Sequence, residues 1–168
     1  MVVRMRPDQL PRALRAEGER IRRAIPKAAR AAAQRFKARL VARTDELGIT
    51  DTGILKNSWR VTPGGDANGA VATVYSDAPH AGVVELGARP HVVSLEGRES
   101  IARWAMRKLG LDEKEAERAS FAIAKKLELV GQKPRYLVRD ALPDARRYFA
   151  EELVRVMSSG SPATGAAP

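Results

Sequence analysis

The 168-residue chain contains no cysteine, and aromatic residues make up only 5% of it. The lack of cysteine excludes a disulfide scaffold, a thiolate zinc site and a cysteine nucleophile. No apolar run approaches the roughly 18 residues of a membrane span, and the first residues lack the apolar core of a signal peptide. We therefore expect a protein that is neither exported by a signal peptide nor embedded in a membrane.

Residues that carry chemistry are also scarce. His80 and His91 are the only two imidazoles. A metal site with Glu85 between them is conceivable, but the spacing matches no familiar ligand pattern, so loop or interface histidines are the better interpretation. There is no Gly-x-Ser-x-Gly nucleophile motif and no phosphate-binding glycine loop. We predict no catalytic residue, no metal site and no cofactor, and hence a protein that is not an enzyme.

Positive charge is concentrated near the N-terminus. The formal net charge is +10, and residues 1–43 hold 13 Arg or Lys against three acids, while the rest balances at 17 against 17. An ordinary solvated helix face is one interpretation, but such faces usually mix both signs. A surplus of one sign favours a polyanion or an acidic protein surface as partner. The predicted basic face consists of Arg12, Arg15, Arg20, Arg23, Lys27, Arg30 and Lys37.

The basic face lies on a predicted helix over residues 8–47. Apolar residues recur there at helical spacing and form a second face. Pro26 predicts a kink or a break into two helices, and Gly48 predicts the end of the helix. The apolar stripe consists of Leu10, Leu14, Ile21, Ile25, Ala28, Ala32, Phe36 and Leu40.

A sheet region is predicted over residues 54–95. The β-branched and aromatic runs 58–62 and 70–75 predict a hairpin, with its turn at Pro63 to Gly69. Residues 81–86 fit a strand or a helical turn, and residues 91–95 are a further strand candidate.

Helical spacing returns over residues 97–157. One helix ends at Gly110 and the next at Gly131, and Asp112 with Glu115 resembles a capping box. The last helix has Asp140 as its expected N-cap and Pro143 in its first turn. This order predicts one α+β domain over residues 1–157, followed by a disordered tail at 158–168.

Three segments resemble one known family. The first runs from Thr52 to Val61 and is similar to a "T-G-x-L-+-x-S-hydrophobic" signature of tail-completion or neck proteins of long-tailed double-stranded DNA bacteriophages. Tyr75 with residues 81–87 resembles that family's "Y-A … hydrophobic-V-E-F/Y-G-T" segment. Residues 133–142 resemble its "R-P-F-L-x-x-A-hydrophobic" segment before the C-terminal helix. The resemblance spans most of residues 10–156.

The resemblance implies a tail-terminator-like fold and a structural role in the virion. It implies a ring, hexameric or else dodecameric, at the head–tail junction around the DNA channel, assembled in the bacterial cytoplasm. The implied partners are the connector or adaptor, the tail terminator or tube proteins, and double-stranded DNA bound without sequence preference. The residues carried over as family-motif or subunit-interface candidates are Gly53, Leu55, Ser58, Trp59, Tyr75, Glu85, Gly87, Pro134 and Tyr136.

Physical roles follow for some of these residues. Gly53 and Gly87 permit turns, Trp59 and Tyr75 are expected to pair across the hairpin, and Glu85 is expected to be held by an Arg or by backbone donors. Two other functions remain open at this point. One is a nucleoid-like protein that binds DNA without sequence preference, and the other is a hydrolase, which the scarcity of histidine disfavours.

Overall fold

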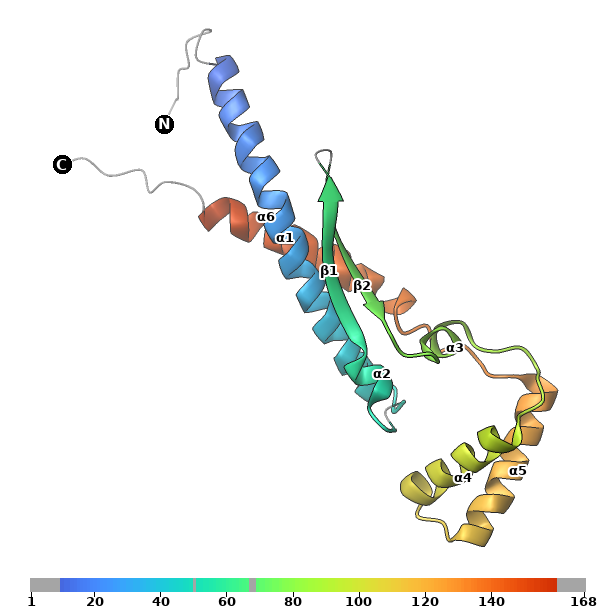
Figure 1. Ribbon diagram of the computed structural model, residues 1–168. Helices are drawn as coiled ribbons and strands as arrows, with labels where there is room; N and C mark the ends of the chain where they lie inside the picture. The colour runs from blue at the N-terminus through green and yellow to red at the C-terminus, as the bar shows by residue number, and fades with distance from the viewer. Residues whose placement is uncertain (1–9, 50, 67–68, 160–168) are drawn as a thin grey trace. The chain divides into compact units, whose positions relative to one another are not determined.

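The computed structural model describes residues 10–49, 51–66 and 69–159 (Figure 1). The two strands form one antiparallel sheet and the remaining elements are helical, so the predicted α+β class is confirmed. The elements in chain order are α1 (Leu10–Glu46), α2 (Ile54–Asn57), β1 (Trp59–Asp66), β2 (Gly69–Ser76), α3 (Ala81–Leu86), α4 (Leu95–Leu109), α5 (Glu113–Val130), the 3-10 turn η1 (Arg139–Ala141) and α6 (Leu142–Ser159).

The chain forms two compact units, each assembled from separate stretches of sequence. The hairpin unit contains α1 up to Arg39, residues 60–75 of the sheet, and the chain from Ala141 onward. The helical unit contains residues 40–59 and 76–140. The single domain over residues 1–157 stays a prediction.

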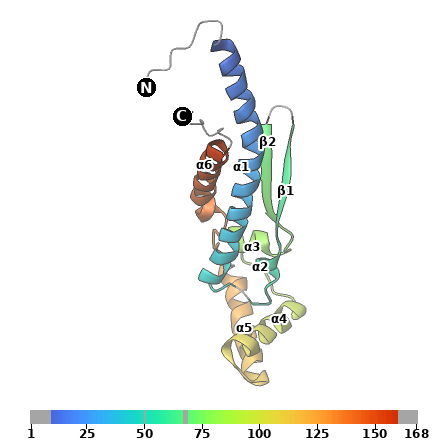
Figure 2. The ribbon, with the colours of Figure 1, turned by 90° about the vertical axis from the view of Figure 1, so that its left-hand side faces the viewer.

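In the hairpin unit, α1 lies between the β-hairpin and α6 (Figure 2). Its buried positions include Ala24, Ala28, Ala32 and Phe36, one in every four residues. Residues spaced by four form a ridge that is inclined to the helix axis. Small alanines on this ridge let the neighbouring backbones approach closely. The core of this unit is therefore a narrow seam along α1.

The predicted apolar stripe is only partly buried. Leu14 is 64% exposed and Ile21 is 41% exposed, so burial begins at Ala24. Of the kink or break predicted near Pro26, the break is wrong, because α1 is one continuous helix through that residue. The kink stays a prediction. A proline inside a helix removes one hydrogen bond donor, and α1 continues through Pro26 in spite of that loss.

The end of α1 follows the prediction. Gly48 has φ of 61°, the left-handed conformation that glycine adopts without strain. Its N–H donates to the Asp45 carbonyl at 2.9 Å, and the Ile49 N–H donates to the Thr44 carbonyl at 3.2 Å. This pair of bonds is a Schellman motif, which ends the helix.

The β-hairpin is longer than predicted, since β1 continues to Asp66 through the expected turn residues. Equal strands joined by two residues place Trp59 opposite Ser76, and Arg60 opposite Tyr75. Neighbouring positions on a strand point to opposite faces. Trp59 is accordingly 4% exposed and Tyr75 is 43% exposed. The predicted pairing of Trp59 with Tyr75 is wrong, because the register separates them.

The helical unit contains helices where the sequence also suggested strands. Residues 81–86 form α3, and residues 91–94 form no strand. The predicted strand over 91–95 is wrong because Ser94 caps a helix: its Oγ accepts the Gly97 N–H at 3.1 Å. The helix α4 therefore begins at Leu95.

The next two helices end and begin as predicted. Gly110 closes α4 in the left-handed conformation, with φ of 67°. Asp112 and Glu115 form the predicted capping box at the start of α5, with both reciprocal hydrogen bonds present. Pro143 lies in the first turn of α6, as predicted. Asp140 lies in η1 rather than at the N-cap, because α6 begins at Leu142.

A two-bond bridge closes the base of the α4–α5 segment. The Ala88 N–H donates to the Gln132 carbonyl at 3.0 Å, and the Gln132 N–H donates to the Ala88 carbonyl at 2.8 Å. Gly87 and Gly131 flank the bridge, and a Cβ at either would lie within 2.3 Å of a backbone oxygen. The chain therefore enters and leaves the α4–α5 segment at the same point. Of the predicted disordered tail, Ser158 and Ser159 are helical, and residues 160–168 lie outside the described residues.

Candidate interaction surfaces

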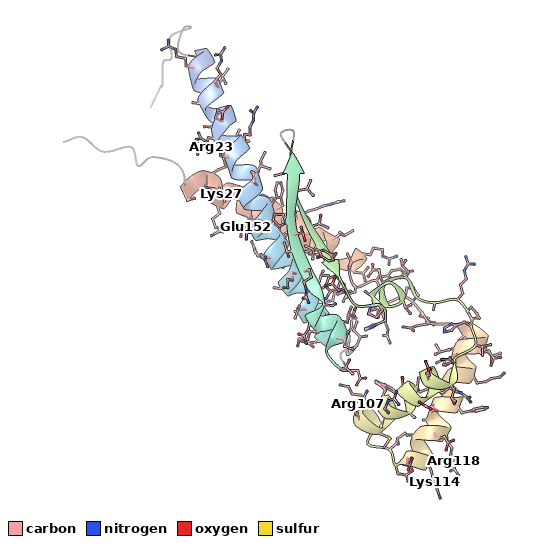
Figure 3. All side chains as sticks on the ribbon, viewed as in Figure 1. Arg23, Lys27, Arg107, Lys114, Arg118 and Glu152 are labelled. Carbon is pink, nitrogen blue, oxygen red and sulfur yellow. The ribbon has the colours of Figure 1, made fainter. Side chains whose placement is uncertain are left out.

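All seven predicted residues of the basic face lie on α1 within the hairpin unit. Arg12, Arg15, Arg23, Lys27 and Arg30 are exposed, and Lys37 is half-buried. Within residues 10–49, 51–66 and 69–159, none of these six side chains forms an ion pair. Figure 3 shows Arg23 and Lys27 one helical turn apart on α1. These cations are therefore available to an external partner.

Arg20 is the exception among the seven predicted residues. Its guanidinium forms an ion pair with Glu17 at 3.4 Å. It also donates to the carbonyl oxygen of Met157 at 2.6 Å, which ties α1 to the last turns of α6. Arg20 is half-buried and acts in the contact between these helices.

Other arginines of α1 have acidic partners that lie more than 100 residues away in the sequence. Arg35 contacts Glu151 at 2.7 Å and Glu152 at 3.2 Å. Arg39 donates to Asp144 at 3.0 Å. The Arg35 guanidinium also lies 4.2 Å from the ring centroid of Tyr148, within cation–π range. These arginines hold α6 against α1, so they are not part of an open cationic surface.

Glu152 is the best-shielded carboxylate in this contact, with its side chain 7% exposed. Its pKa lies below the ordinary value, chiefly because Arg155 donates a hydrogen bond to it at 2.7 Å. Burial opposes that shift, and the hydrogen bond from Arg35 adds to it. The pKa of Arg35 is raised in turn, first by its hydrogen bond with Glu151. The site is a structural ion-pair cluster.

Within the helical unit, Arg43 donates to Asp140 at 3.0 Å. Arg35, Arg39 and Arg43 are four residues apart, and Asp140, Asp144 and Glu152 are spaced by four and eight. This correspondence was not predicted, although the matching spacing of the basic and acidic residues is visible in the sequence. Part of the positive surplus of residues 1–43 is thus neutralised by acids from the C-terminal part of the chain.

An apolar groove lies close to the basic face, between α1 and α6. It has a volume of about 680 Å³ and is lined by Arg20, Ile21, Leu153, Val154, Met157 and Ser158. Val154 is 66% exposed, and Leu14 lies further along α1. Leu14 and Ile21 were predicted on the apolar face of the helix. In the structure they give the basic end of α1 an adjoining apolar surface.

Three candidate residues of the first family motif are buried in their own chain. Leu55, Ser58 and Trp59 are 4–6% exposed, and the Ser58 Oγ lies 2.6 Å from the Ser76 Oγ. Gly53 has φ of 79° and precedes α2. These side chains serve the packing of the chain, because they have no surface to offer a neighbouring subunit.

The second and third motifs meet in the helical unit. The Glu85 carboxylate accepts the N–H groups of Val138 and Arg139, at 2.7 and 2.9 Å. Glu85 is thus held by backbone donors, one of the two expected ways. The Tyr136 N–H donates to the Glu85 carbonyl at 3.3 Å. Pro134 lies against Gly87, where a Cβ would be 2.9 Å from the proline nitrogen.

The exposed side chains of the second and third motifs are aromatic and basic. Tyr136 has φ of 48°, an unusual conformation for a residue with a side chain. Its ring lies 3.2 Å from the Arg139 guanidinium carbon. Tyr75 and Arg139 are exposed, and Glu85 and Tyr136 are half-buried. The candidate motif residues therefore divide into a buried set and a partly accessible set.

Among the described residues, no group of three or more His, Asp or Glu side chains has the geometry to hold a metal ion. His80 is exposed, and the His91 Nδ1 lies 2.8 Å from the Arg89 carbonyl oxygen. In this part of the chain, no helix is both long and apolar enough to cross a bilayer.

Comparison with known proteins identifies one family. Residues 8–87 match the family model described as "Bacteriophage HK97-gp10, putative tail-component". The matched region contains α1, the hairpin and α3, and it includes the first two of the three motifs. No curated protein and no solved structure matches the chain. The predicted resemblance to a phage tail family is confirmed over residues 8–87.

Proposed function

We propose that the protein is a structural ring subunit of the head–tail junction, because residues 8–87 match the model of the HK97 gp10-like family of bacteriophage tail components. The ring, hexameric or else dodecameric, joins the connector to the tail terminator or tube and surrounds the DNA channel. It assembles in the host cytoplasm and has no enzymatic role. Closed rings are built from repeated contacts between unlike faces of one chain.

The observation that carries the DNA-facing part of this proposal is the basic face of α1. Arg12, Arg15, Arg23, Lys27 and Arg30 are exposed and, among the described residues, have no acidic partner. By contrast, Arg35 and Arg39 in the same helix are neutralised by α6. Like charges on one helix face repel each other. Phosphate groups passing along that face relieve the repulsion, so duplex DNA is the proposed partner.

The chemistry of the face fits contact without sequence readout. Its members are Arg and Lys, which bind phosphate, and no aromatic residue lies among them to stack on bases. Such contact is weak enough for DNA to slide, which genome passage through a channel requires. The adjoining groove at Ile21, Val154 and Met157 gives the same end of α1 an apolar surface for a neighbouring protein.

A charge-reversal variant tests this proposal. Changing Arg12, Arg15, Arg23 and Arg30 to Glu alters exposed residues that make no ion pair in the described structure, so the fold is expected to survive. A matched control reverses Arg89, Lys126, Lys133 and Arg146, which are also exposed. We expect the first variant to lose duplex binding and completion of infectious particles. The control is expected to retain both, although its net charge is the same.

Salt dependence separates the possible partners. Binding to DNA predicts an affinity that falls with salt, with a slope of about −0.9 per neutralised phosphate, and does not depend on sequence. If neither the wild type nor the charge-reversed variant binds DNA, and only the variant fails to dock on the connector, an acidic protein face is the partner. Normal particle formation by the reversed variant contradicts any role for the basic face. A particle that contains a single copy of this chain contradicts the ring.

No comparison supports the alternative of a nucleoid-like DNA-binding protein, because the matching family is one of tail components. The mass of the assembled protein distinguishes the two, because a nucleoid protein does not form a discrete ring of six or twelve subunits.

A further inference from the structure

The helical hairpin formed by α4 and α5 (residues 95–130) has a small core of its own. The buried positions of the two helices are Ala105 in α4 and Ala116, Ser120 and Ala124 in α5. These side chains are all small, so they allow close helix contact but bury little apolar area. Several large apolar residues of the same two helices are exposed instead.

Three of those residues border a surface groove. Leu95 and Phe121 are 64% and 62% exposed, and Met106 is 42% exposed. The groove has a volume of about 770 Å³. A second hollow of about 370 Å³, lined in part by Val92 and Val93, shares Phe121 with the first. Phe121 is thus a projecting ring with a hollow on each side.

The charges around the groove are self-complementary. Arg98, Glu113, Glu117 and Arg118 line it, and within the described part of the chain none of the four forms an ion pair. They comprise two residues of each sign. Figure 3 shows Arg118 on α5, one turn from Lys114. A nucleic acid would meet the two glutamates, and a uniformly acidic or basic protein would meet two like charges. A second copy of the same surface supplies an opposite charge for each of the four.

We propose that the α4–α5 hairpin is a self-association surface, at which two copies of the chain pack as a four-helix bundle. In a two-fold contact, Phe121 of each copy enters a hollow of the other, and the positive rim residues of one copy meet the negative ones of the other. Large side chains that a two-helix hairpin leaves exposed become the core of four helices. This contact is independent of the proposed head–tail role, because residues 95–130 lie outside the family-matched region.

The first test removes the projecting ring from the full-length chain. Phe121→Gln alters a mainly exposed residue, so folding is expected to persist, as circular dichroism and thermal unfolding will show. Analytical ultracentrifugation at tens of micromolar is expected to show that the mass of the assembly is halved, whatever other contacts contribute. Leu129→Gln is the matched control: Leu129 is 66% exposed on α5 but lines neither hollow. The control should retain the wild-type mass.

The second test uses charge in a mixing experiment. The acidic variant carries Arg98→Glu and Arg118→Glu, and the basic variant carries Glu113→Lys and Glu117→Lys. In each variant alone, the four rim residues without an ion pair have one sign, beside the Arg103–Glu99 pair that also lines the groove, and the variant should show the halved mass of Phe121→Gln. An equimolar mixture should regain the wild-type mass, and the regain should weaken with added salt.

Three results would overturn the proposal. One is a wild-type protein whose mass equals that of Phe121→Gln at every concentration measured. Another is equal association of the acidic variant, the basic variant and the wild type. The third is a mixture that remains as small as its two components.

Discussion

The carboxylate of Glu85 accepts the backbone N–H of Val138 at 2.7 Å, across 53 residues of sequence. Its second oxygen accepts the N–H of Arg139 at 2.9 Å. One side chain thereby fastens α3 to the segment that leads into η1. The glutamate lies in the family-matched region and its donors lie outside it, so this contact joins the two.

Glu85→Gln is expected to destabilise the protein by about 1–3 kcal/mol, because an amide offers one acceptor oxygen where the carboxylate uses two. Urea unfolding monitored by circular dichroism measures this loss. The control is Glu128→Gln, which removes an exposed ion pair with Lys125 and should cost about 0.5 kcal/mol or less. Equal costs for the two variants would show that the Glu85 contact adds no stability.

Gly87→Ala is expected to destabilise the protein by at least about 2 kcal/mol. Gly87 has φ of 75°, and a Cβ there would lie 2.3 Å from the Gln132 carbonyl oxygen. That oxygen belongs to the bridge with Ala88, so it cannot move without breaking a hydrogen bond. Gly82→Ala is the matched control, five residues earlier inside α3. No atom lies within 4 Å of its Cβ position, so alanine should stabilise by about 0.5–1 kcal/mol.

Glu152 is expected to make the stability of the protein depend on pH in the acid range. Its folded-state pKa lies below the ordinary value of 4.5, so its contribution is present above that pH and is lost as the pH falls through the folded-state pKa. The difference in unfolding free energy between wild type and Glu152→Gln should therefore be largest near neutral pH and shrink below pH 4.5.

Two further variants identify the cause of that pH dependence. Arg155→Met removes the main hydrogen bond to Glu152 and should reduce the effect. Arg146→Met removes an exposed arginine of the same helix and should leave it unchanged. A constant wild-type to Glu152→Gln difference between pH 7 and pH 3 would contradict this assignment.

Leu40 and Leu14 belong to the same predicted stripe but should respond differently to truncation. Leu40 is fully buried, so Leu40→Ala is expected to cost about 2–5 kcal/mol. Leu14 is 64% exposed, so Leu14→Ala should change stability by about 0.5 kcal/mol or less. Thermal unfolding of both variants measures the contrast. A large loss at Leu14 would show that the N-terminal part of α1 is packed within the isolated chain.

Local chemistry determined much of this protein directly from its sequence. The Schellman glycine at Gly48, the capping box at Asp112 and the proline in the first turn of α6 are short-range effects that involve residues within a few positions of each other. The hairpin could be predicted for the same reason. The three motifs located the segments that carry the family resemblance, because such signatures are read residue by residue.

Only the tertiary structure decided which residues of the apolar stripe are buried and which of the arginines are paired with acids. Periodicity places Leu14 and Leu40 on one face, but burial depends on whether another element covers that part of the helix. Net charge counts Arg35 and Arg12 alike, yet only Arg35 has acids of α6 beside it. A strand was predicted over residues 91–95, but Ser94 caps a helix that begins at the next residue. Propensity and charge are properties of a residue and its sequence neighbours, whereas burial and pairing depend on segments that only the fold brings together.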